Sequence, residues 1–581
     1  MGSLLLMLFF VTALLPPGAA ISAEAGGGVS ARTIIDLQPY CQSASMNIQG
    51  GQGQKGVATL IDLNPRVRGW YLLKLAWEGA PPEIYHLENS APRAQKLELE
   101  EDNPRGLVIV SAGEKVSCSL FGAGARDDLR QARRSGTALA PLCGGRLFLR
   151  NSVKGHRTAI ESVTDFLRHR VPGGEEVVSF VRDTFFTYVY QKKAEGSLEP
   201  GPQGGPAPKE PLEAPAGALI DRDRAGSPVK PVDLGIDIEG PSPAEMVPGA
   251  WYGARGNPGI YASVLVPGWI APEIMGSYRD LVNPLDRVER EQLVYLVAFD
   301  LSLFNLHYTL GTDHPGVGWS AHISPRMRDA SMPGPDGIGT SAPLVRTGLV
   351  SPTDAKTIAA TFTGGFKRHH GAFKYGELSL RNHGSHYGFM EEGTLFSTLQ
   401  PGLATIYALD DGWVDMATWS TEANKLLPRI VDARQNGVPL IERFDEARRI
   451  SVPGALVARW GPGNWSGSTD EKLQTMRGGI ALQEQRGRRF LIYAFFWSVT
   501  PSAMTRVFQA YQCRYAMLID MNALVHTYLA VYRREGPRLY VQHLIKGMRE
   551  SDLLAKGQYM PRFLGFADDR DFFSLTRKEK P

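Results

Sequence analysis

Short apolar runs separated by Gly, Pro and Asn fill the chain from residue 30 to residue 150. Gly56–Leu63 and Trp70–Leu75 are two of these runs. This spacing is typical of strands in an all-β sandwich or barrel. Apolar residues at helical spacing follow near residues 160–167. The pattern therefore predicts a mostly β N-terminal domain over residues 30–190 that ends in helices.

Residues 193–247 are rich in Pro, Gly, Ala and charge. A segment of this composition buries too little apolar surface to offset the entropy lost on ordering. We therefore expect a linker between two domains. A chain of 581 residues is also longer than one hydrophobic core usually supports.

The region 248–581 contains a helix start at Thr500-Pro501, where a capping hydroxyl precedes a proline at the first helical position. The unbroken apolar run Tyr515–Ile519 follows and predicts a buried strand that ends at Asp520. The pattern predicts an α/β or α+β domain of the kind that carries catalysis. Ligand sites in α/β sheets lie at the carboxyl ends of strands, so Asp520 is a candidate site residue.

The N-terminus carries an apolar run, Leu4–Leu15, followed by small residues with cleavage expected after Ala20 or Ala23. This pattern predicts a signal peptide over residues 1–25 and an exported protein, periplasmic or extracellular, with no membrane-spanning segment in the mature chain. In such a compartment Cys118 and Cys143, which lie close in one predicted domain, are expected to form a disulfide.

The net charge of +3, from 63 basic and 60 acidic residues, argues against a nucleic-acid partner. Any cationic site must therefore be local. The stretch 361–390 holds four of the twelve histidines beside glycines and cations. Gly364 and Gly365 allow backbone N–H groups to face an anion, and Lys367 and Arg368 add positive charge. Phosphate or a phosphodiester is the first ligand class to consider, and a glycine-kinked strand with a solvated basic face is the alternative.

Three segments then resemble one family in order along the chain. Ala360–Phe366 resembles the Asn-Gly-Gly-Phe signature of the phosphodiester glycosidases, and Arg477–Leu482 is similar to their Arg-Thr-Ala-Ile-Gly strand. Thr500–Asp520 resembles their closing helix and strand, which end in Leu-Asp-Gly-Gly-Gly-Ser. The resemblance covers roughly residues 352–530.

Two positions depart from the family pattern. Thr363 stands where the family has Asn, and Met521-Asn522 stand where it has glycines. The resemblance implies an α/β fold, cleavage of a glycosidic phosphodiester, and a sugar phosphodiester or phosphorylated glycan as the binding partner.

Cleaving such a bond requires cations for the departing phosphate and a carboxylate or activated water at the anomeric carbon. Asp520 is the candidate nucleophile, general base or stabiliser of the oxocarbenium ion. His383 and His386 could position the diester or transfer a proton. Asp520 could instead cap the loop after its strand. The residues expected to bind the substrate phosphate are Thr363, Gly364, Gly365, Lys367, Arg368, Arg477 and Asn522.

No cofactor is required by this chemistry, although His383, His386 and Asp411 could hold a divalent metal. The leading hypothesis is an exported hydrolase of a glycosidic phosphodiester, with cell-envelope glycans as candidate substrates. A catalytically silent phosphoglycan-binding module and a metal-dependent hydrolase are the alternatives. The sequence leaves the oligomeric state open.

Overall fold

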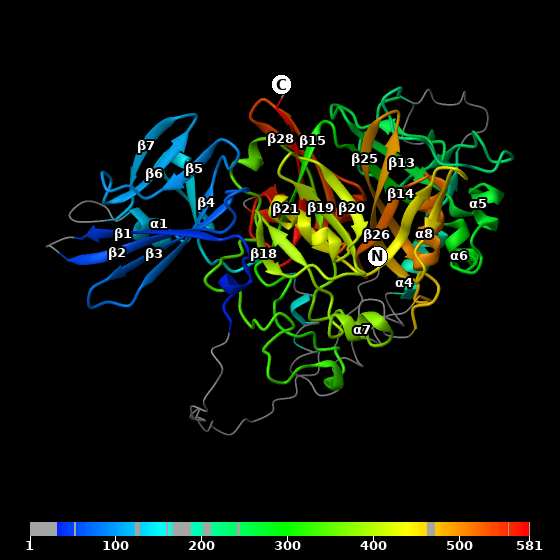
Figure 1. Ribbon diagram of the computed structural model, residues 1–581. Coiled ribbons are helices and arrows are strands. Elements are labelled where there is room, and N and C mark those ends of the chain that lie inside the picture. The colour runs from blue at the N-terminus through cyan, green and yellow to red at the C-terminus, as the bar shows by residue number, and fades with distance from the viewer. Residues whose placement is uncertain are drawn as a thin grey trace, which may run out of the picture.

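The structure is a computed structural model (Figure 1). It describes residues 32–50, 54–121, 128–158, 161–163, 166, 187–201, 211–240, 245–461, 471–555 and 557–579. The predicted signal peptide, residues 1–25, lies outside the described residues, as does most of the predicted helical region after residue 158. Within the described ranges, no helix is long and apolar enough to cross a membrane.

The N-terminal part forms two antiparallel sheets, seen in blue at one side of the molecule in Figure 1. The larger sheet has the order β1 (Gln42–Gln49), β2 (Lys55–Asp62), β3 (Trp70–Trp77), β4 (Glu83–Asn89), β9 (Leu147–Arg150) and β8 (Leu139–Leu142). The smaller sheet consists of β5 (Gln95–Glu98), β6 (Gly106–Ser111) and β7 (Glu114–Ser119). Helix α1 (Asp128–Arg134) packs beside β8.

A separate hydrophobic core, which includes Leu73, Tyr85 and Ile109, joins these two sheets. Cys118 in β7 and Cys143 after β8 form the predicted disulfide, with Cα atoms 5.6 Å apart. The bond ties the smaller sheet to the larger one. Disulfides of this kind are typical of an oxidising compartment.

The largest sheet of the main body has eight strands, all paired antiparallel. Its order is β12 (Tyr252–Gly253), β13 (Ile260–Leu265), β14 (Val294–Asp300), β25 (Arg488–Val499), β24 (Thr475–Gln485), β26 (Tyr515–Met521), β22 (Pro439–Asp445) and β23 (Ile450–Pro453). The helices near it are α4 (Thr187–Glu195), α5 (Pro272–Gly276), α6 (Arg287–Glu291) and α8 (Pro501–Ala510).

Two five-stranded sheets complete the main body. The first has the order β15 (Phe304–Thr309), β31 (Phe572–Arg577), β16 (Ile358–Thr363), β27 (Leu529–Glu535) and β28 (Arg538–His543). The second has the order β18 (Thr394–Ser397), β17 (Phe389–Glu391), β21 (Ile430–Gln435), β19 (Ala404–Leu409) and β20 (Val414–Thr418). Smaller elements are the ribbons β10 (Glu199–Pro200) with β11 (Val229–Lys230) and β29 (Leu553–Ala555) with β30 (Gln558–Met560), and helix α7 (Glu377–Arg381).

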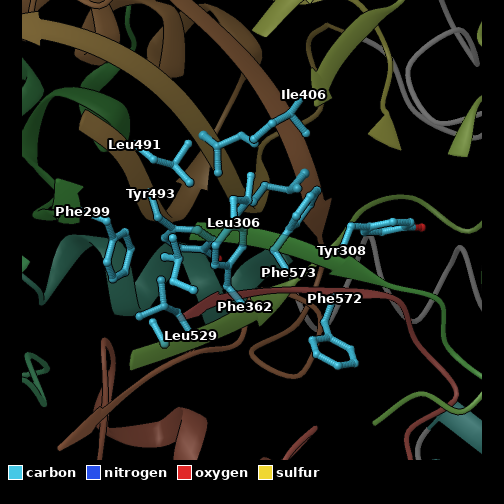
Figure 2. Close-up of a cluster of buried hydrophobic side chains, with 14 of the residues drawn as sticks. Phe299, Leu306, Tyr308, Phe362, Ile406, Leu491, Tyr493, Leu529, Phe572 and Phe573 are labelled. Carbon is cyan, nitrogen blue, oxygen red and sulfur yellow. The ribbon is translucent and has the colours of Figure 1, made fainter. Parts of the chain in front are cut away.

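The main core lies where these sheets face one another. Figure 2 shows Phe299, Phe362, Tyr493, Leu529 and Phe573 gathered in it from five different strands. Phe362 stacks on Phe573 with ring centroids 5.2 Å apart. Burial of such aromatic side chains is the main term that holds the sheets together.

The prediction of an α/β or α+β main domain is wrong, because the protein is mostly β and its named strands pair antiparallel. The predicted helix and strand do exist as α8 and β26. However, β24 lies between β25 and β26 and runs antiparallel to both. The tight turn at Arg486-Gly487, where both residues have positive φ, folds β25 back onto β24 and creates this arrangement.

Part of the predicted linker packs against the main body. Leu234, Ile236 and Ile238 are buried in the main core, and Val229 pairs with Pro200 across the β10–β11 ribbon. Alternate apolar residues in this short stretch bury enough surface to hold it, even though its average composition is that of a linker. This stretch therefore differs from the expected free linker.

Candidate functional site

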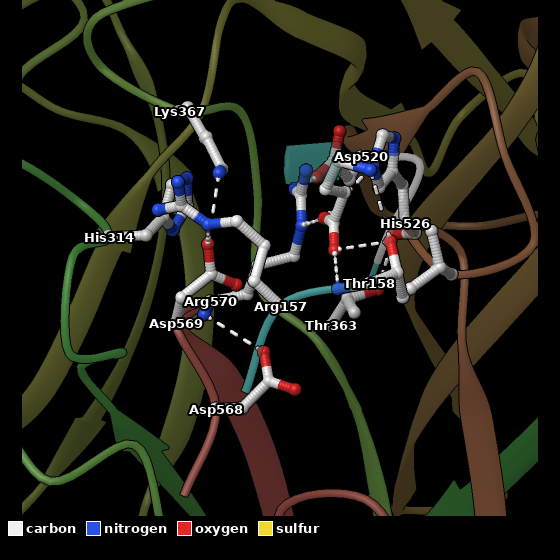
Figure 3. A network of polar contacts seen from close by, with 12 residues as sticks. Arg157, Thr158, His314, Thr363, Lys367, Asp520, His526, Asp568, Asp569 and Arg570 are labelled. Carbon is white, nitrogen blue, oxygen red and sulfur yellow. Dashed lines mark hydrogen bonds and ion pairs between the residues drawn. The ribbon is translucent and has the colours of Figure 1, made fainter. Parts of the chain in front are cut away.

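A run of charged residues, Asp568-Asp569-Arg570-Asp571, stands immediately before strand β31. All four are buried, and each side chain pairs with an oppositely charged side chain. Figure 3 shows three of them, Asp568, Asp569 and Arg570. Charged side chains are almost never buried unless they are paired, so this run organises the surrounding residues. We call it the 568–571 run.

Arg570 joins two carboxylates that come from distant parts of the chain. Its guanidinium lies 2.5 Å from Oδ2 of Asp520 and 2.6 Å from Oε1 of Glu161. Burial lowers the pKa of Arg570, but these carboxylates outweigh that effect and raise it above the ordinary value. Arg570 therefore stays charged.

Asp520 is the sixth residue of the buried strand β26. Its Oδ1 accepts a hydrogen bond of 2.8 Å from the N–H of Met521, and its Oδ2 accepts from Arg570. The sequence placed a carboxylate at the end of a buried strand, but gave no indication of Arg570 as its partner.

Glu161 reaches the site from the segment that follows the N-terminal sheets. Its Oε2 accepts hydrogen bonds from the N–H and hydroxyl of Thr158, at 3.1 and 3.0 Å. Nε2 of His526 lies 3.4 Å from Oε1 of the same carboxylate. Burial would raise the pKa of Glu161, but Arg570 and His526 together hold it well below its usual range. Glu161 is therefore ionised, and its carboxylate occupies a position beside the cationic guanidinium of Arg570.

Lys367 enters the site next to the 568–571 run. Its Nζ lies 3.2 Å from Oδ2 of Asp569, and Nε of Arg157 lies 2.9 Å from the same oxygen. Burial would raise the pKa of Asp569, but the charges of Lys367 and Arg570 lower it overall. Lys367 is thus brought close to the Asp520–Arg570 pair through two adjacent residues of the run.

The glycine pair predicted to face an anion instead makes room for protein atoms. The N–H of Gly364 donates to the carbonyl of Asp571 at 2.9 Å. A Cβ at Gly364 would lie 2.5 Å from Oδ2 of Asp571, and one at Gly365 would lie 2.9 Å from Oδ1 of Asn436. Both positions therefore exclude larger residues, because the loop passes close to the buried network.

Asp571 is held by three side chains of the main body. It pairs with Nδ1 of His314, with Nε of Arg434 at 2.8 Å, and with the hydroxyl of Tyr308 at 2.8 Å. Burial would raise the pKa of Asp571, but His314 and Arg434 hold it below its usual range. These contacts anchor the 568–571 run to the main body.

Thr363 and Asn522 lie next to the site and bond to the backbone or to a neighbouring hydroxyl. The hydroxyl of Thr363 donates to the carbonyl of His526 at 2.6 Å. Oδ1 of Asn522 accepts from the hydroxyl of Thr475 at 3.0 Å, and Asn522 has a positive φ of 79°. Both residues shape the loops beside Asp520.

The remaining predicted cations are buried and bonded to the protein. Arg477 donates to the carbonyls of Val499 and Leu473 at 2.9 and 2.8 Å. Arg368 donates to the carbonyls of His386 and Val317, both at 3.1 Å. Arg368 also lies 3.6 Å from the carboxylate of Asp336, so both arginines make contacts that support the fold.

The three candidate metal ligands have different surroundings; they are His383, His386 and Asp411. His386 is buried, stacks on Phe373 with centroids 4.3 Å apart, and has a pKa lowered to about 3, mainly by burial. His383 is exposed, and the carboxylate of Asp411 is paired with Arg429 at 2.5 Å. In the part of the chain that the structure describes, no group of three His, Cys, Asp or Glu side chains could hold a metal ion.

Sequence reasoning missed the 568–571 run, Glu161, Arg157 and the contact of His526 with Glu161. One local signal existed: four consecutive charged residues before the apolar run Phe572-Phe573 are unusual at the start of a buried strand. Nothing local marks Glu161, because its partner is 409 residues away.

Comparisons with known proteins find a likeness in structure but none in sequence. No protein-family model matches the sequence, and no curated protein matches it. The structure is similar to the catalytic domain of zebrafish N-acetylglucosamine-1-phosphodiester alpha-N-acetylglucosaminidase, described as auto-inhibited by its pro-peptide. The match has 10% identity and a TM-score of 0.28, and covers 64% of this chain and 96% of that chain.

Proposed function

We propose that this chain is an exported hydrolase that cleaves a glycosidic phosphodiester, in the periplasm or outside the cell. The observation that carries the proposal is the Asp520–Arg570 pair at the end of β26, with Lys367 joined to the same charged run. Asp520 ends one of the segments that resemble the phosphodiester glycosidases, and Lys367 directly follows another, Ala360–Phe366. A carboxylate beside fixed cations is what cleavage of a glycosyl phosphate requires.

The charge balance of the site favours a singly charged anion as substrate. Among the described residues, five buried carboxylates of the network face five cations, and the exposed Asp313 also pairs with one of these cations, Arg157. The carboxylates are Glu161, Asp520, Asp568, Asp569 and Asp571, and the cations are Arg157, Lys367, Arg434, Arg562 and Arg570. Withdrawal of Glu161 from Arg570 would leave one positive charge. A phosphodiester carries one negative charge and would restore the balance.

Arg570 is suited to hold the phosphate because a guanidinium donates two parallel hydrogen bonds to two oxygens. As the bond between the sugar C1 and the phosphate oxygen breaks, its electron pair goes to the phosphate, which gains charge. Arg570 and Lys367 would stabilise that charge more strongly in the transition state than in the bound diester.

Asp520 would act on the sugar side of the same bond. A water oxygen bonds to C1, and the proton that this water loses passes to the Asp520 carboxylate and then to solvent. The negative charge of Asp520 also stabilises the positive charge that develops at C1. The products are the free sugar and a phosphate monoester.

Hydrolysis of methyl diesters of glucose 1-phosphate and N-acetylglucosamine 1-phosphate tests the proposal. We expect wild type to release sugar and Asp520→Asn to bind the diesters but not cleave them. Asp411→Asn is the matched control, because Asp411 is exposed and pairs only with surface groups. If wild type binds the diesters but releases no sugar, a binding module is favoured. Loss of wild-type activity on chelation would indicate a metal-dependent hydrolase instead.

A further inference from the structure

The N-terminal sheet docks on the main body through a buried group of carboxylates. Arg150, at the end of β9, pairs with Glu88 of β4 and, at 3.2 Å, with Glu391 of β17. The guanidinium also donates to the carbonyl of Val345 at 3.0 Å. One buried arginine therefore links the N-terminal sheet to two segments of the main body.

Two more carboxylates lie beside Glu391. The N–H of Glu392 donates to Oδ1 of Asp432 at 3.2 Å, whereas Oδ2 of Asp432 is buried and has no hydrogen-bond partner among the described residues. Glu392 is half-buried and lies against the N-terminal sheet, since a Cβ at Gly69 would be 2.5 Å from its Oε2. We call Glu88, Glu391, Glu392 and Asp432 the docking cluster.

Negative charge dominates this cluster. Asp354 also acts on Glu392 and Asp432, whereas Arg150 pairs with Glu88 and Glu391. The other titratable or charged groups that face the cluster are His86, His307, Tyr308 and Arg346. His307 approaches Asp432 only to 3.9 Å, and burial keeps His86 neutral by lowering its pKa well below the ordinary value. Loss of hydration and mutual repulsion disfavour four or five ionised carboxylates in such a buried site.

We propose that the docking cluster makes the contact between the N-terminal sheet and the main body depend on pH, tight in mild acid and weaker above neutrality. The inference is independent of the catalytic proposal, because none of these side chains belongs to the network around Arg570.

The direction follows from the carboxyl groups. Burial raises the pKa of Glu391 to about 7, despite the opposing effect of Arg150. Burial also raises the pKa of Asp432, and burial together with Asp432 raises that of Glu392. A raised pKa contributes stability that is fully present below the ordinary value of 4.5 and is lost as pH rises through about 7. Protonated, neutral carboxyl groups in the cluster therefore favour the buried contact in mild acid.

Hydrogen exchange of the full chain tests this inference. The N–H of Val345 donates to Nδ1 of His86 across the contact at 2.8 Å, so its protection reports docking. After correction for intrinsic exchange, we expect protection at Val345 to fall at least tenfold from pH 5 to pH 8 in wild type. Equal protection at the two pH values would overturn the proposal.

Two variants test the assignment to the cluster. Glu391→Gln and the double variant Glu392→Gln/Asp432→Asn should each reduce the pH dependence, and either suffices if the other does not fold. Asp410→Asn is the control, since Asp410 pairs with the exposed Arg66 at the same contact and should leave the pH dependence unchanged. Wild-type pH dependence in every folded variant would show that other groups control docking.

Discussion

Replacing Glu161 by Gln should strengthen anion binding at Arg570. Gln has nearly the same size as Glu but lacks the negative charge that now lies 2.6 Å from the guanidinium of Arg570. The Gln side chain still accepts a hydrogen bond from the charged guanidinium, but it loses the Coulomb attraction of the ion pair, part of which is offset because a neutral group costs less to desolvate. The competing contact should therefore weaken by about 1–1.5 kcal/mol, which corresponds to roughly a tenfold increase in affinity for a phosphodiester.

The assay is the KM for the methyl diester of the hydrolysed sugar phosphate, with the Kd for inorganic phosphate measured in parallel. Glu195→Gln is the matched control, because Glu195 pairs with an arginine that is 65% exposed and lies outside the network. The Glu161 pKa is held below its usual range, so its contact with Arg570 persists as pH falls until that lowered pKa is reached. The advantage of the Gln variant should therefore remain in mild acid. If folded Glu161→Gln has the wild-type KM and phosphate Kd, Glu161 does not compete for the anion position.

Three further predictions concern catalysis, a buried histidine and the disulfide. Asp520→Asn should lower kcat about 100-fold or more while diester binding stays within a few-fold, measured by product release and calorimetry; an unchanged kcat would remove Asp520 from the mechanism. His386→Phe should keep activity within a few-fold, because both ring nitrogens of His386 are buried without hydrogen-bond partners among the described residues and its pKa is lowered to about 3; a 100-fold loss in the folded variant would show a direct role. Replacing Cys118 and Cys143 by Ser should lower the free energy of unfolding by about 3 kcal/mol for a loop of 25 residues, and urea unfolding would contradict this if the midpoint did not move.

Local sequence patterns predicted local structure well. The Thr500-Pro501 pair predicted the start of α8, where the Thr500 hydroxyl accepts from the N–H of Ala503. The apolar run before Asp520 predicted β26, and the run Trp70–Leu75 predicted most of β3. These features depend on backbone and side-chain preferences of residues within about one turn or one strand of each other.

The sequence did not determine which strands pair. Strand, helix and strand in succession are typical of a parallel sheet, yet the antiparallel β24 lies between β25 and β26. The tight turn at Arg486-Gly487 carries the relevant information, but its effect depends on where β24 packs. Strand pairing is chosen by the whole core, so a single segment could not indicate it.

For the candidate site too, the sequence marked some residues and only the tertiary structure identified their partners. The sequence by itself marked Asp520 and Lys367 as residues of the right chemical type, and composition marked the loop around them as cationic. Only the tertiary structure distinguished Lys367, which pairs with Asp569 of the 568–571 run, from its neighbour Arg368, which bonds to backbone carbonyls and pairs with Asp336. The physical reason is that a buried charge is defined by its partner, and the partners of Asp520 and Glu161 meet at Arg570 from positions 50 and 409 residues away.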